Sequence, residues 1–286
     1  MSQQAAGLEE REGTFKAPDG VELYYVSRRD PTQVARRLVI TVHGFADHAG
    51  RMPYLVQHLA GRGAVVYSFD QRGNGKSPGR RGHIDSYQEI VEDLKAFIEL
   101  ATGAEPGLER VLLGHSTGGI LAMALALQEP AAVDRLVLSA PALVLAFKAP
   151  AWKDSLARVM AVLRPTLTMQ AGFPPESVAR EPEVIRANKA DPLVVQDMSS
   201  RFYSEVYLNA APSMLRRAGE IKIPFLLLQG TGDLLVDPDG AEQLNRSAEV
   251  PHVYRTYEGA YHEIFNDICR EEVFADLDHW LEAPIP

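Results

Sequence analysis

The sequence predicts an α/β fold, with a mostly parallel central sheet flanked by helices. Short runs that are almost wholly apolar, such as residues 37–43, 63–70 and 110–114, alternate with helical patterns along much of the chain. Because these runs lack polar–apolar alternation, they are typical of parallel strands buried on both faces. The segment 14–26 holds two β-rich runs around Pro18-Asp19-Gly20, which predicts an antiparallel hairpin at the start of the sheet.

The remaining elements are predicted from the same patterns. The strands are expected at 37–43, 63–70, 110–114, 134–140, 224–230 and 252–259, and the helices at 54–62, 86–103 and from about His262 to Leu281. The helix at 86–103 opens with Ser86 and Glu89 in the spacing of a capping box, in which side chain and backbone cap each other.

A long segment interrupts this alternation, since no strand is evident from about Ala142 to Ala218. Apolar residues instead keep a helical spacing in two sets, Trp152, Leu156, Val159, Met160 and Leu163, and Met198, Phe202, Val206, Ala210 and Met214. The sequence therefore predicts a core made of residues 1–141 and 219–286, with a helical insertion at 142–218. The methionines and aromatics of the insertion fit either ordinary core or the wall of an acyl channel, with Leu156 and Met160 as first candidates.

Composition limits the function classes. The 286 residues are 46% hydrophobic, and the formal net charge of −9 disfavours nucleic acid as a partner and gives no attraction to an anionic membrane. The polar, acidic first residues are expected to be disordered and lack the pattern of a secretory signal, and no apolar run approaches the length of a membrane span. A single cysteine, Cys269, fits a reducing compartment. A cytoplasmic protein is therefore predicted, while its oligomeric state stays open.

The stretch "GHSTGG" places Ser116 between a predicted strand and a predicted helix. The pattern G-x-S-x-G is typical of a sharp strand-to-helix turn that projects a nucleophilic serine, and the flanking glycines avoid Cβ clashes. The alternative is a glycine-rich turn in which Ser116 only caps the helix. The apolar runs on both sides favour the nucleophile.

A serine nucleophile needs a base and an acid, which follow it in the order acid, then histidine, in this kind of site. His262 is the predicted base because it follows the last strand, at a loop from which a side chain can reach Ser116. Asp233 and Asp237 compete for the acid after the strand at 224–230. Asp237 precedes Pro238 and is expected to cap a helix, which leaves Asp233 to orient His262.

Two backbone N–H groups are expected to bind the oxyanion that forms during attack on a carbonyl. Thr117 directly follows the nucleophile, and Phe45 follows "HG" at the end of the first parallel strand. His43 is expected to order that loop. No metal site and no cofactor are expected: the chain has no HExxH pair, and "DQRGNGKS" has Asp70 where a phosphate-binding loop needs glycine.

Together these segments resemble the α/β-hydrolase superfamily and, within it, monoacylglycerol lipases and lysophospholipases. The resemblance is carried, in family order, by "HGFADHAGR", "FDQRGNGKSPGRRGHIDSY", "GHSTGG", "NKADPL", "PFLLLQGTGDLLVD" and "YEGAYHEIFND". It implies an α/β-hydrolase fold with a helical cap over the site, no cofactor, and a Ser116–Asp233–His262 triad. It also implies Phe45 and Thr117 at the oxyanion hole. Asp47, His48 and Arg51 match a polar stretch of the family, which implies a place near the rim of the substrate pocket.

The predicted function is hydrolysis of carboxylic esters of single-chain lipids, with monoacylglycerol as the first substrate. The alternatives are a lysophospholipase, a short-chain carboxylesterase, and a ligand-binding receptor on the same fold. The predicted partners are a small lipid ester and, through the outer face of the insertion, lipid aggregates. Acyl-chain length, positional preference and pathway are not predicted.

Overall fold

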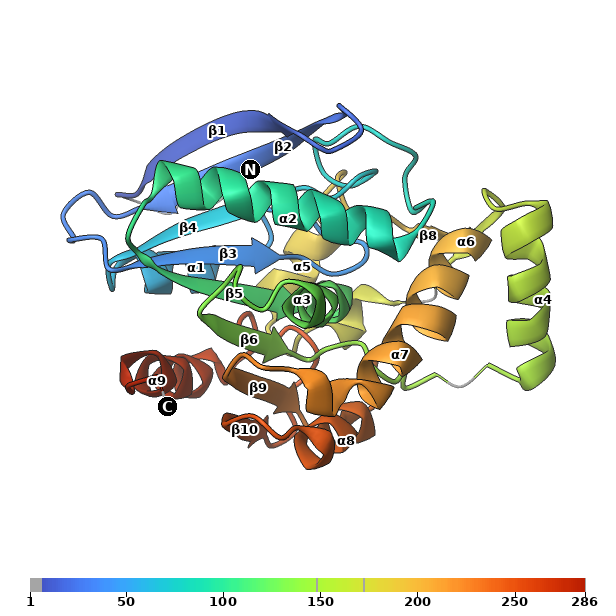
Figure 1. The fold of residues 1–286 in the computed structure, drawn as a ribbon. Helices are drawn as coiled ribbons and strands as arrows, with labels where there is room; N and C mark the ends of the chain where they lie inside the picture. The colour runs from blue at the N-terminus through green and yellow to red at the C-terminus, as the bar shows by residue number, and fades with distance from the viewer. Residues whose placement is uncertain (1–6, 148, 172, 286) are drawn as a thin grey trace.

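The computed structural model describes residues 7–147, 149–171 and 173–285. Its centre is an eight-stranded sheet in the order β1-β2-β4-β3-β5-β6-β9-β10 (Figure 1). The strands are β1 (Glu9–Lys16), β2 (Glu22–Arg29), β3 (Arg37–Val42), β4 (Ala64–Phe69), β5 (Glu109–His115), β6 (Arg135–Ser139), β9 (Phe225–Gly230) and β10 (His252–Tyr257). β1 and β2 are antiparallel, and β2 also meets β4 antiparallel, whereas the other neighbours are parallel. The predicted α/β class, hairpin and strands are confirmed.

Helices cover both faces of the sheet. They are α1 (Pro53–Ala60), α2 (Tyr87–Ala104), α3 (Thr117–Gln128), α8 (Pro238–Ser247) and α9 (Arg270–Glu282). In the central strands alternate side chains enter separate cores: Leu112 packs in the core that contains α2 and α3, and Val111 in the core that contains α1 and α9. This two-sided burial explains the almost wholly apolar strand sequences. The Ser86 side chain caps α2 by accepting the Glu89 N–H at 3.1 Å, which confirms the Ser86 half of the predicted capping box.

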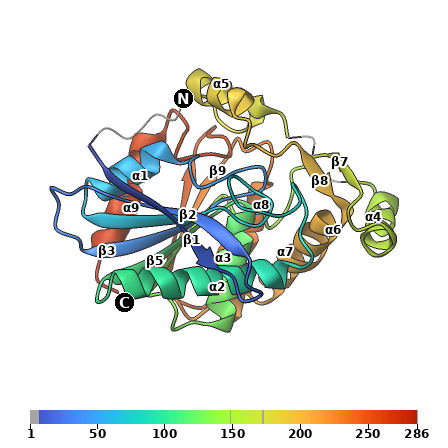
Figure 2. The same cartoon turned by 90° about the horizontal axis from the view of Figure 1, so that it is seen from above.

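The chain between β6 and β9 forms a separate group of elements. These are α4 (Ala151–Leu163), β7 (Thr168–Gln170), η1 (Pro175–Ser177), α5 (Pro182–Ala190), β8 (Asp197–Ser199), α6 (Ser200–Tyr203), η2 (Ser204–Ala210), α7 (Ala211–Arg216) and η3 (Ala218–Glu220). Figure 1 shows α4 standing outside α6, away from the sheet, and Figure 2 shows the β7–β8 ribbon between α5 and α4.

The expectation of no strand in 142–218 is wrong. β7 and β8 pair antiparallel, with Met169 opposite Met198. Each has only three residues, too few for polar–apolar alternation to be recognised in the sequence. Met198, which its spacing predicts on a helix, lies in β8.

The second helical set is not one regular α-helix, because η2 has the wider π-helical turn. In an α-helix four residues turn by about 400°, so a stripe with a spacing of four drifts by about 40° at each step. The slower winding of η2 offsets this drift. As a result Phe202, Val206, Ala210 and Met214 are all buried.

The last helix also begins later than predicted. α9 starts at Arg270, whereas His262 and the residues after it form turns. The side chain of Asp267 accepts the Tyr261 and Ile268 N–H groups and so supports a compact loop in place of a helical turn. His262 therefore lies on a loop between β10 and α9.

Candidate active site

Ser116 lies at the bend between β5 and α3. Its backbone has φ 55° and ψ −122°, a region that costs a non-glycine residue energy and is typical of functional sites. The neighbouring glycines make the bend possible: a Cβ on Gly114 would lie 2.4 Å from the Gly118 carbonyl oxygen, and one on Gly118 would lie 2.2 Å from that of Val42. The chain thus presents the Ser116 hydroxyl at the N-terminus of α3, where the helix dipole favours negative charge.

His262 and Asp233 form a buried pair. The Nδ1 atom of His262 lies 2.7 Å from Oδ2 of Asp233, and both side chains are at most 7% exposed. The other oxygen of Asp233 accepts the Leu235 and Val236 N–H groups at 2.8 and 3.0 Å, which fixes the carboxylate beyond β9. Asp237 instead caps α8 by accepting the Asp239 N–H, so the predicted cap is confirmed.

The pair is electrostatically stable as a carboxylate facing an imidazole. Burial favours the neutral form of Asp233, but His262 and the two N–H groups outweigh it and lower the pKa of the carboxyl. Burial likewise opposes a charge on His262, but Asp233, with help from Glu263 and Asp47, raises the pKa of the imidazole above 6.5. Asp233 can therefore stabilise the cation that forms when His262 takes a proton.

A second imidazole stands beside this pair. The His115 ring is centred 4.8 Å from that of His262, and its Nδ1 lies 3.2 Å from the Ser139 hydroxyl. Burial, with the nearby His262 charge, lowers the pKa of His115 to about 3. His115 is therefore neutral at physiological pH and does not compete for the proton.

The loop after β3 lies directly against the nucleophile. A Cβ on Gly44 would be 2.8 Å from the Ser116 Cβ, and Ala46 has a φ of 65°. Among the described residues, neither the Phe45 N–H nor the Thr117 N–H donates a backbone or side-chain hydrogen bond, so both are free for an oxyanion. His43 orders this loop as predicted: its Nε2 accepts the Gln71 N–H at 3.1 Å, and its Nδ1 lies 2.8 Å from the Gly44 carbonyl.

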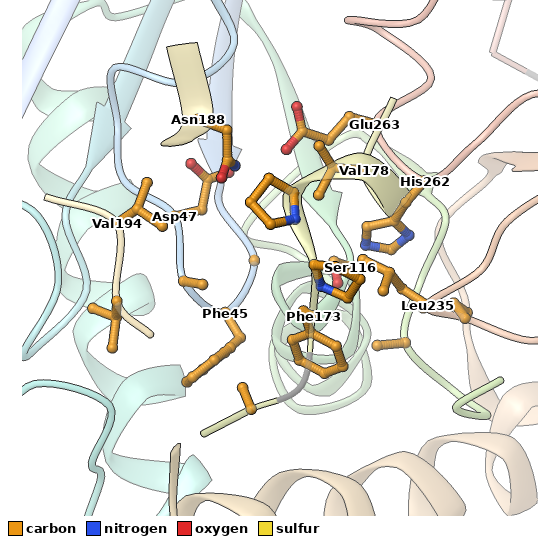
Figure 3. Close-up of a pocket in the computed structure, with 18 of the residues that line it drawn as sticks. Phe45, Asp47, Ser116, Phe173, Val178, Asn188, Val194, Leu235, His262 and Glu263 are labelled. Atoms are coloured by element: carbon orange, nitrogen blue, oxygen red, sulfur yellow. The ribbon is translucent and has the colours of Figure 1, made fainter. Parts of the chain in front are cut away.

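A cavity of about 380 Å³ contains both Ser116 and His262 in its wall, a size within the range of small-molecule sites. In Figure 3, Asp47, Asn188 and Glu263 lie on one side of Ser116, and Phe45 and Phe173 on the other. The apolar part of the wall also includes Ala142, Leu145, Val178, Val194, Val195, Tyr207, Leu235 and Val236. We call the side with Asp47, Asn188 and Glu263 the polar end and the side with Phe45 and Phe173 the apolar end; Val178 and Val194 lie beside the carboxylates in Figure 3. The nucleophile thus stands between the two ends.

The structure brings most of the predicted site residues to this cavity. Phe45, Asp47, Arg51, Ser116 and His262 line it, while Thr117 starts α3 and Asp233 backs His262.

Leu156, Met160 and His48 are not among the described residues that line the cavity. Leu156 is 50% exposed on α4, so of the two interpretations, ordinary core or the wall of an acyl channel, the structure supports neither for Leu156, and Met160 does not line the cavity either. Met160 is partly buried, beside the buried Ala161, but it does not reach the cavity. The spacing of apolar residues within one helix does not reveal which of them a neighbouring element covers. His48 instead pairs with Asp191, at 2.9 Å, where the loop after β3 meets the end of α5.

Several residues of the cavity wall could not be predicted from the sequence. Asn188, Tyr207 and Phe173 come from the segment between β6 and β9. Asn188 opens the stretch "NKADPL", which carried the resemblance but indicated no role for it, and no motif includes Tyr207 or Phe173. Glu263 carried a signal, because it directly follows the predicted base in "YHEIF". Its role depends on Arg51, which lies far away in the sequence and was not connected to it.

No group of three or more His, Cys, Asp or Glu side chains within the described parts of the chain could hold a metal ion. None of the helices described here is long and apolar enough to cross a membrane.

The fold, with a serine on a strained bend beyond the fifth strand, defines the class of α/β-hydrolases. A family model described as serine aminopeptidase, S33, matches residues 33–268. The chain belongs to this family.

Curated and solved proteins agree with this assignment. A monoacylglycerol lipase from Mycolicibacterium smegmatis is 32% identical over 94% of this chain and 96% of its own. The phospholipase YtpA from Bacillus subtilis is 32% identical over 83% of this chain and 92% of its own. The crystal structure of a monoacylglycerol lipase from Paleococcus ferrophilus has a TM-score of 0.81 and 34% identity, over 91% of this chain and 98% of that one. The chain is thus monoacylglycerol lipase-like in sequence and fold.

Proposed function

We propose that this protein is a carboxylic-ester hydrolase that cleaves monoacylglycerol into glycerol and a fatty acid. The observation that carries this proposal is the cavity in which Ser116 stands between a polar end and an apolar end. A monoacylglycerol has the same division, with a hydroxylated head and one acyl chain on either side of its ester. Two of the monoacylglycerol lipases to which this chain is similar, from Mycolicibacterium smegmatis and Paleococcus ferrophilus, support the same substrate.

In the proposed mechanism, Ser116 attacks the ester carbonyl while His262 takes its proton, and Asp233 stabilises the resulting cation. The Phe45 and Thr117 N–H groups bind the oxyanion. The proton then passes from His262 to the departing glycerol oxygen and leaves an acyl-enzyme. Water, activated by the same imidazole, attacks this ester, releases the fatty acid and restores Ser116.

The apolar wall is proposed to hold the acyl chain. Phe45 and Phe173 meet edge to face with ring centres 6.1 Å apart, and both line the cavity. Each buried CH₂ group contributes about 0.8 kcal/mol, so kcat/KM should rise with chain length until the wall is filled. A cavity of this size has no room for three chains, so triacylglycerols should be poor substrates.

Residues 142–218 are proposed to act as a cap that meets lipid aggregates. α4 exposes several large apolar side chains that nothing in the described structure covers: Trp152, Leu156, Val159, Val162 and Leu163. Phe147, Leu167 and Met169 near its ends are also exposed. An exposed apolar patch is typical of an interaction surface, and a substrate that aggregates supplies the partner. We also propose a cytoplasmic location, with a single, partly buried thiol at Cys269 as its support.

The test is a side-by-side assay of monoacylglycerol, lysophosphatidylcholine, p-nitrophenyl butyrate and triacylglycerol with the wild-type chain and Ser116→Ala. The lysophospholipase alternative is included because of the relative named phospholipase. We expect the highest kcat/KM on monoacylglycerol, and nearly complete loss in Ser116→Ala with the fold intact. A higher kcat/KM on lysophosphatidylcholine or on p-nitrophenyl butyrate than on monoacylglycerol would show that the proposed substrate is wrong. Turnover that survives in Ser116→Ala would reject the serine mechanism.

A further inference from the structure

Three charged side chains form the polar end of the cavity. The guanidinium of Arg51 is 7% exposed and places Nη2 2.9 Å from Oε1 of Glu263 and Nε 3.3 Å from Oδ1 of Asp47. The other carboxylate oxygen of Glu263 accepts a hydrogen bond from the Asn266 amide at 2.8 Å. These contacts fix the position of the Glu263 carboxylate. Glu263 directly follows His262 in the chain.

The charges at this end do not balance. Among the described residues that line the cavity, Asp47 and Glu263 are the only carboxylates, and Arg51 is the only lysine or arginine. Burial disfavours a charge on Arg51, but Glu263 and Asp47 outweigh it and raise the pKa of the guanidinium, so the cation persists. The polar end therefore carries an excess of one negative charge.

Arg51 is also poorly placed to bind an anion. A phosphate site generally uses the guanidinium as a two-pronged donor, but Nη2 of Arg51 is engaged by Glu263, and Nε faces Asp47 without forming a hydrogen bond. A phosphate that used Nε and Nη2 as its two donors would have to displace one of these carboxylates. It would then lie beside an uncompensated buried negative charge.

We propose that Glu263, together with Asp47, is a specificity-determining residue that admits uncharged polyol headgroups and rejects phosphorylated ones. This inference rests on the proposed function and narrows its substrate class. Carboxylate oxygens that accept one hydrogen bond each can accept others from hydroxyl groups. The Asn188 amide lines the same end of the cavity. A phosphate monoester brings between one and two negative charges at neutral pH, and like charges repel strongly where water is excluded.

The test compares 1-lauroylglycerol with 1-lauroylglycerol 3-phosphate, which differ only in the headgroup, below their aggregation limits. The wild-type chain is expected to prefer the uncharged ester by about 100-fold in kcat/KM. Glu263→Gln keeps the shape and the hydrogen-bonding oxygen but removes the charge, so the preference should fall by about tenfold. Asp47→Asn removes the negative charge on the other side of Arg51 and should also lower the preference for 1-lauroylglycerol. It takes the place of Glu263→Gln in the test if that variant does not fold.

Glu271→Gln is the matched control. Glu271 lies on α9 with its side chain 85% exposed and does not line the cavity. Glu271→Gln removes the same charge from the protein surface, so the preference for 1-lauroylglycerol should stay at the wild-type value. A loss of preference in Glu271→Gln equal to that in Glu263→Gln would mean that overall charge is responsible, and the proposal would fail.

A second readout distinguishes the charge of Glu263 from a structural role. Asp233, Glu263 and Asp47 raise the pKa of His262, the His115 ring stands beside it, and the Arg51 cation lies between Glu263 and Asp47. Because Glu263 contributes to the raised pKa of the imidazole, Glu263→Gln should move the acidic limb of kcat/KM for p-nitrophenyl butyrate to lower pH. An unmoved limb would show that this charge does not reach the reacting atoms and would overturn the proposal.

The two proposals fail differently. If the wild-type chain hydrolyses the two lauroyl esters at similar rates, or if the preference persists in both Glu263→Gln and Asp47→Asn, the headgroup filter is wrong while monoacylglycerol hydrolysis stands. If the wild-type chain releases no fatty acid from 1-lauroylglycerol, the proposed function itself is wrong.

Discussion

At the scale of single residues, the site depends on positions that can accommodate only one type of residue. Gly114 and Gly118 have backbone atoms within 2.4 Å of where a Cβ would lie, which lets Ser116 occupy its strained bend. These residues could be predicted because their chemistry is local: the glycines flank the serine, and Pro238 marks Asp237 as a cap. Glu263 could not be assigned a role, because its partner Arg51 is brought to it only by the fold.

The two aspartates after β9 should respond differently to substitution. Asp233→Asn should lower kcat by about 10⁴, because the imidazole loses the partner that orients it. Asp237→Ala should lower the free energy of unfolding by about 1 kcal/mol through loss of the α8 cap, with kcat nearly unchanged. Steady-state kinetics and urea unfolding of both variants check this. A large loss of kcat in Asp237→Ala with normal kcat in Asp233→Asn would reverse the assignment.

The activity should depend on pH through His262. The imidazole accepts the Ser116 proton only in its neutral form, and its pKa is raised above 6.5, chiefly by Asp233 acting against burial. Activity should therefore be lost as the pH falls through this raised pKa, and kcat/KM should have an acidic midpoint above 6.5. A profile measured from pH 5 to 9 on a soluble ester checks this, and a midpoint well below 6.5 would contradict the electrostatics of the pair.

At the scale of elements, the core strands were predictable and the cap elements only partly so. A strand buried on both faces, such as β5, has a distinctive apolar sequence. The apolar stripe of α4, by contrast, indicates a helix correctly but does not say what covers it. In the structure Ala161 is buried while Trp152 is 64% exposed. Burial of a helix depends on its packing partners, and these lie elsewhere in the sequence.

The exposed face of α4 should matter most for aggregated substrate. Trp152→Ser with Leu156→Ser removes two large side chains that are 64% and 50% exposed, each worth about 1.5–3 kcal/mol if fully buried in lipid. Hydrolysis of monoacylglycerol in phosphatidylcholine vesicles should fall by about tenfold or more relative to hydrolysis of p-nitrophenyl butyrate.

Val34→Ser serves as the control for α4, because Val34 is 80% exposed on the loop before β3, outside the cap. Its ratio of vesicle to soluble activity should match the wild type. Equal losses on both substrates in the α4 double variant would mean that this face does not contact lipid.

At the scale of the whole molecule, the segment between β6 and β9 is joined to the loop that carries His262. The buried carboxylate of Asp267 accepts hydrogen bonds from the Arg180 backbone N–H and from its guanidinium, the latter at 2.8 Å. The Glu263 N–H donates to the Val178 carbonyl at 2.7 Å in the same region. The overall topology was predictable from the order of strands and helices, but this junction between distant segments was not.

Asp267→Ala should therefore destabilise the whole fold. It leaves the partly exposed Arg180 without its ion-pair partner and three backbone N–H groups without an acceptor. Each buried N–H left unsatisfied costs about 1–3 kcal/mol, so a loss of about 3 kcal/mol or more is expected. Thermal or urea unfolding monitored by circular dichroism measures the loss. The exposed Glu271→Ala should change stability by less than about 0.5 kcal/mol. A loss in Asp267→Ala no larger than that control would show that this junction is not important for stability.

The central claim is that a single activated serine, Ser116, carries the ester hydrolysis. Its most direct test is to treat the folded wild-type chain with a fluorophosphonate, map the adduct by mass spectrometry and follow monoacylglycerol hydrolysis in the same sample. The account predicts one adduct, on Ser116, with activity lost in proportion to labelling, and no adduct in Ser116→Ala or, on the same timescale, in His262→Ala. Full activity with Ser116 labelled, or an adduct on another residue that accounts for the loss, would contradict it.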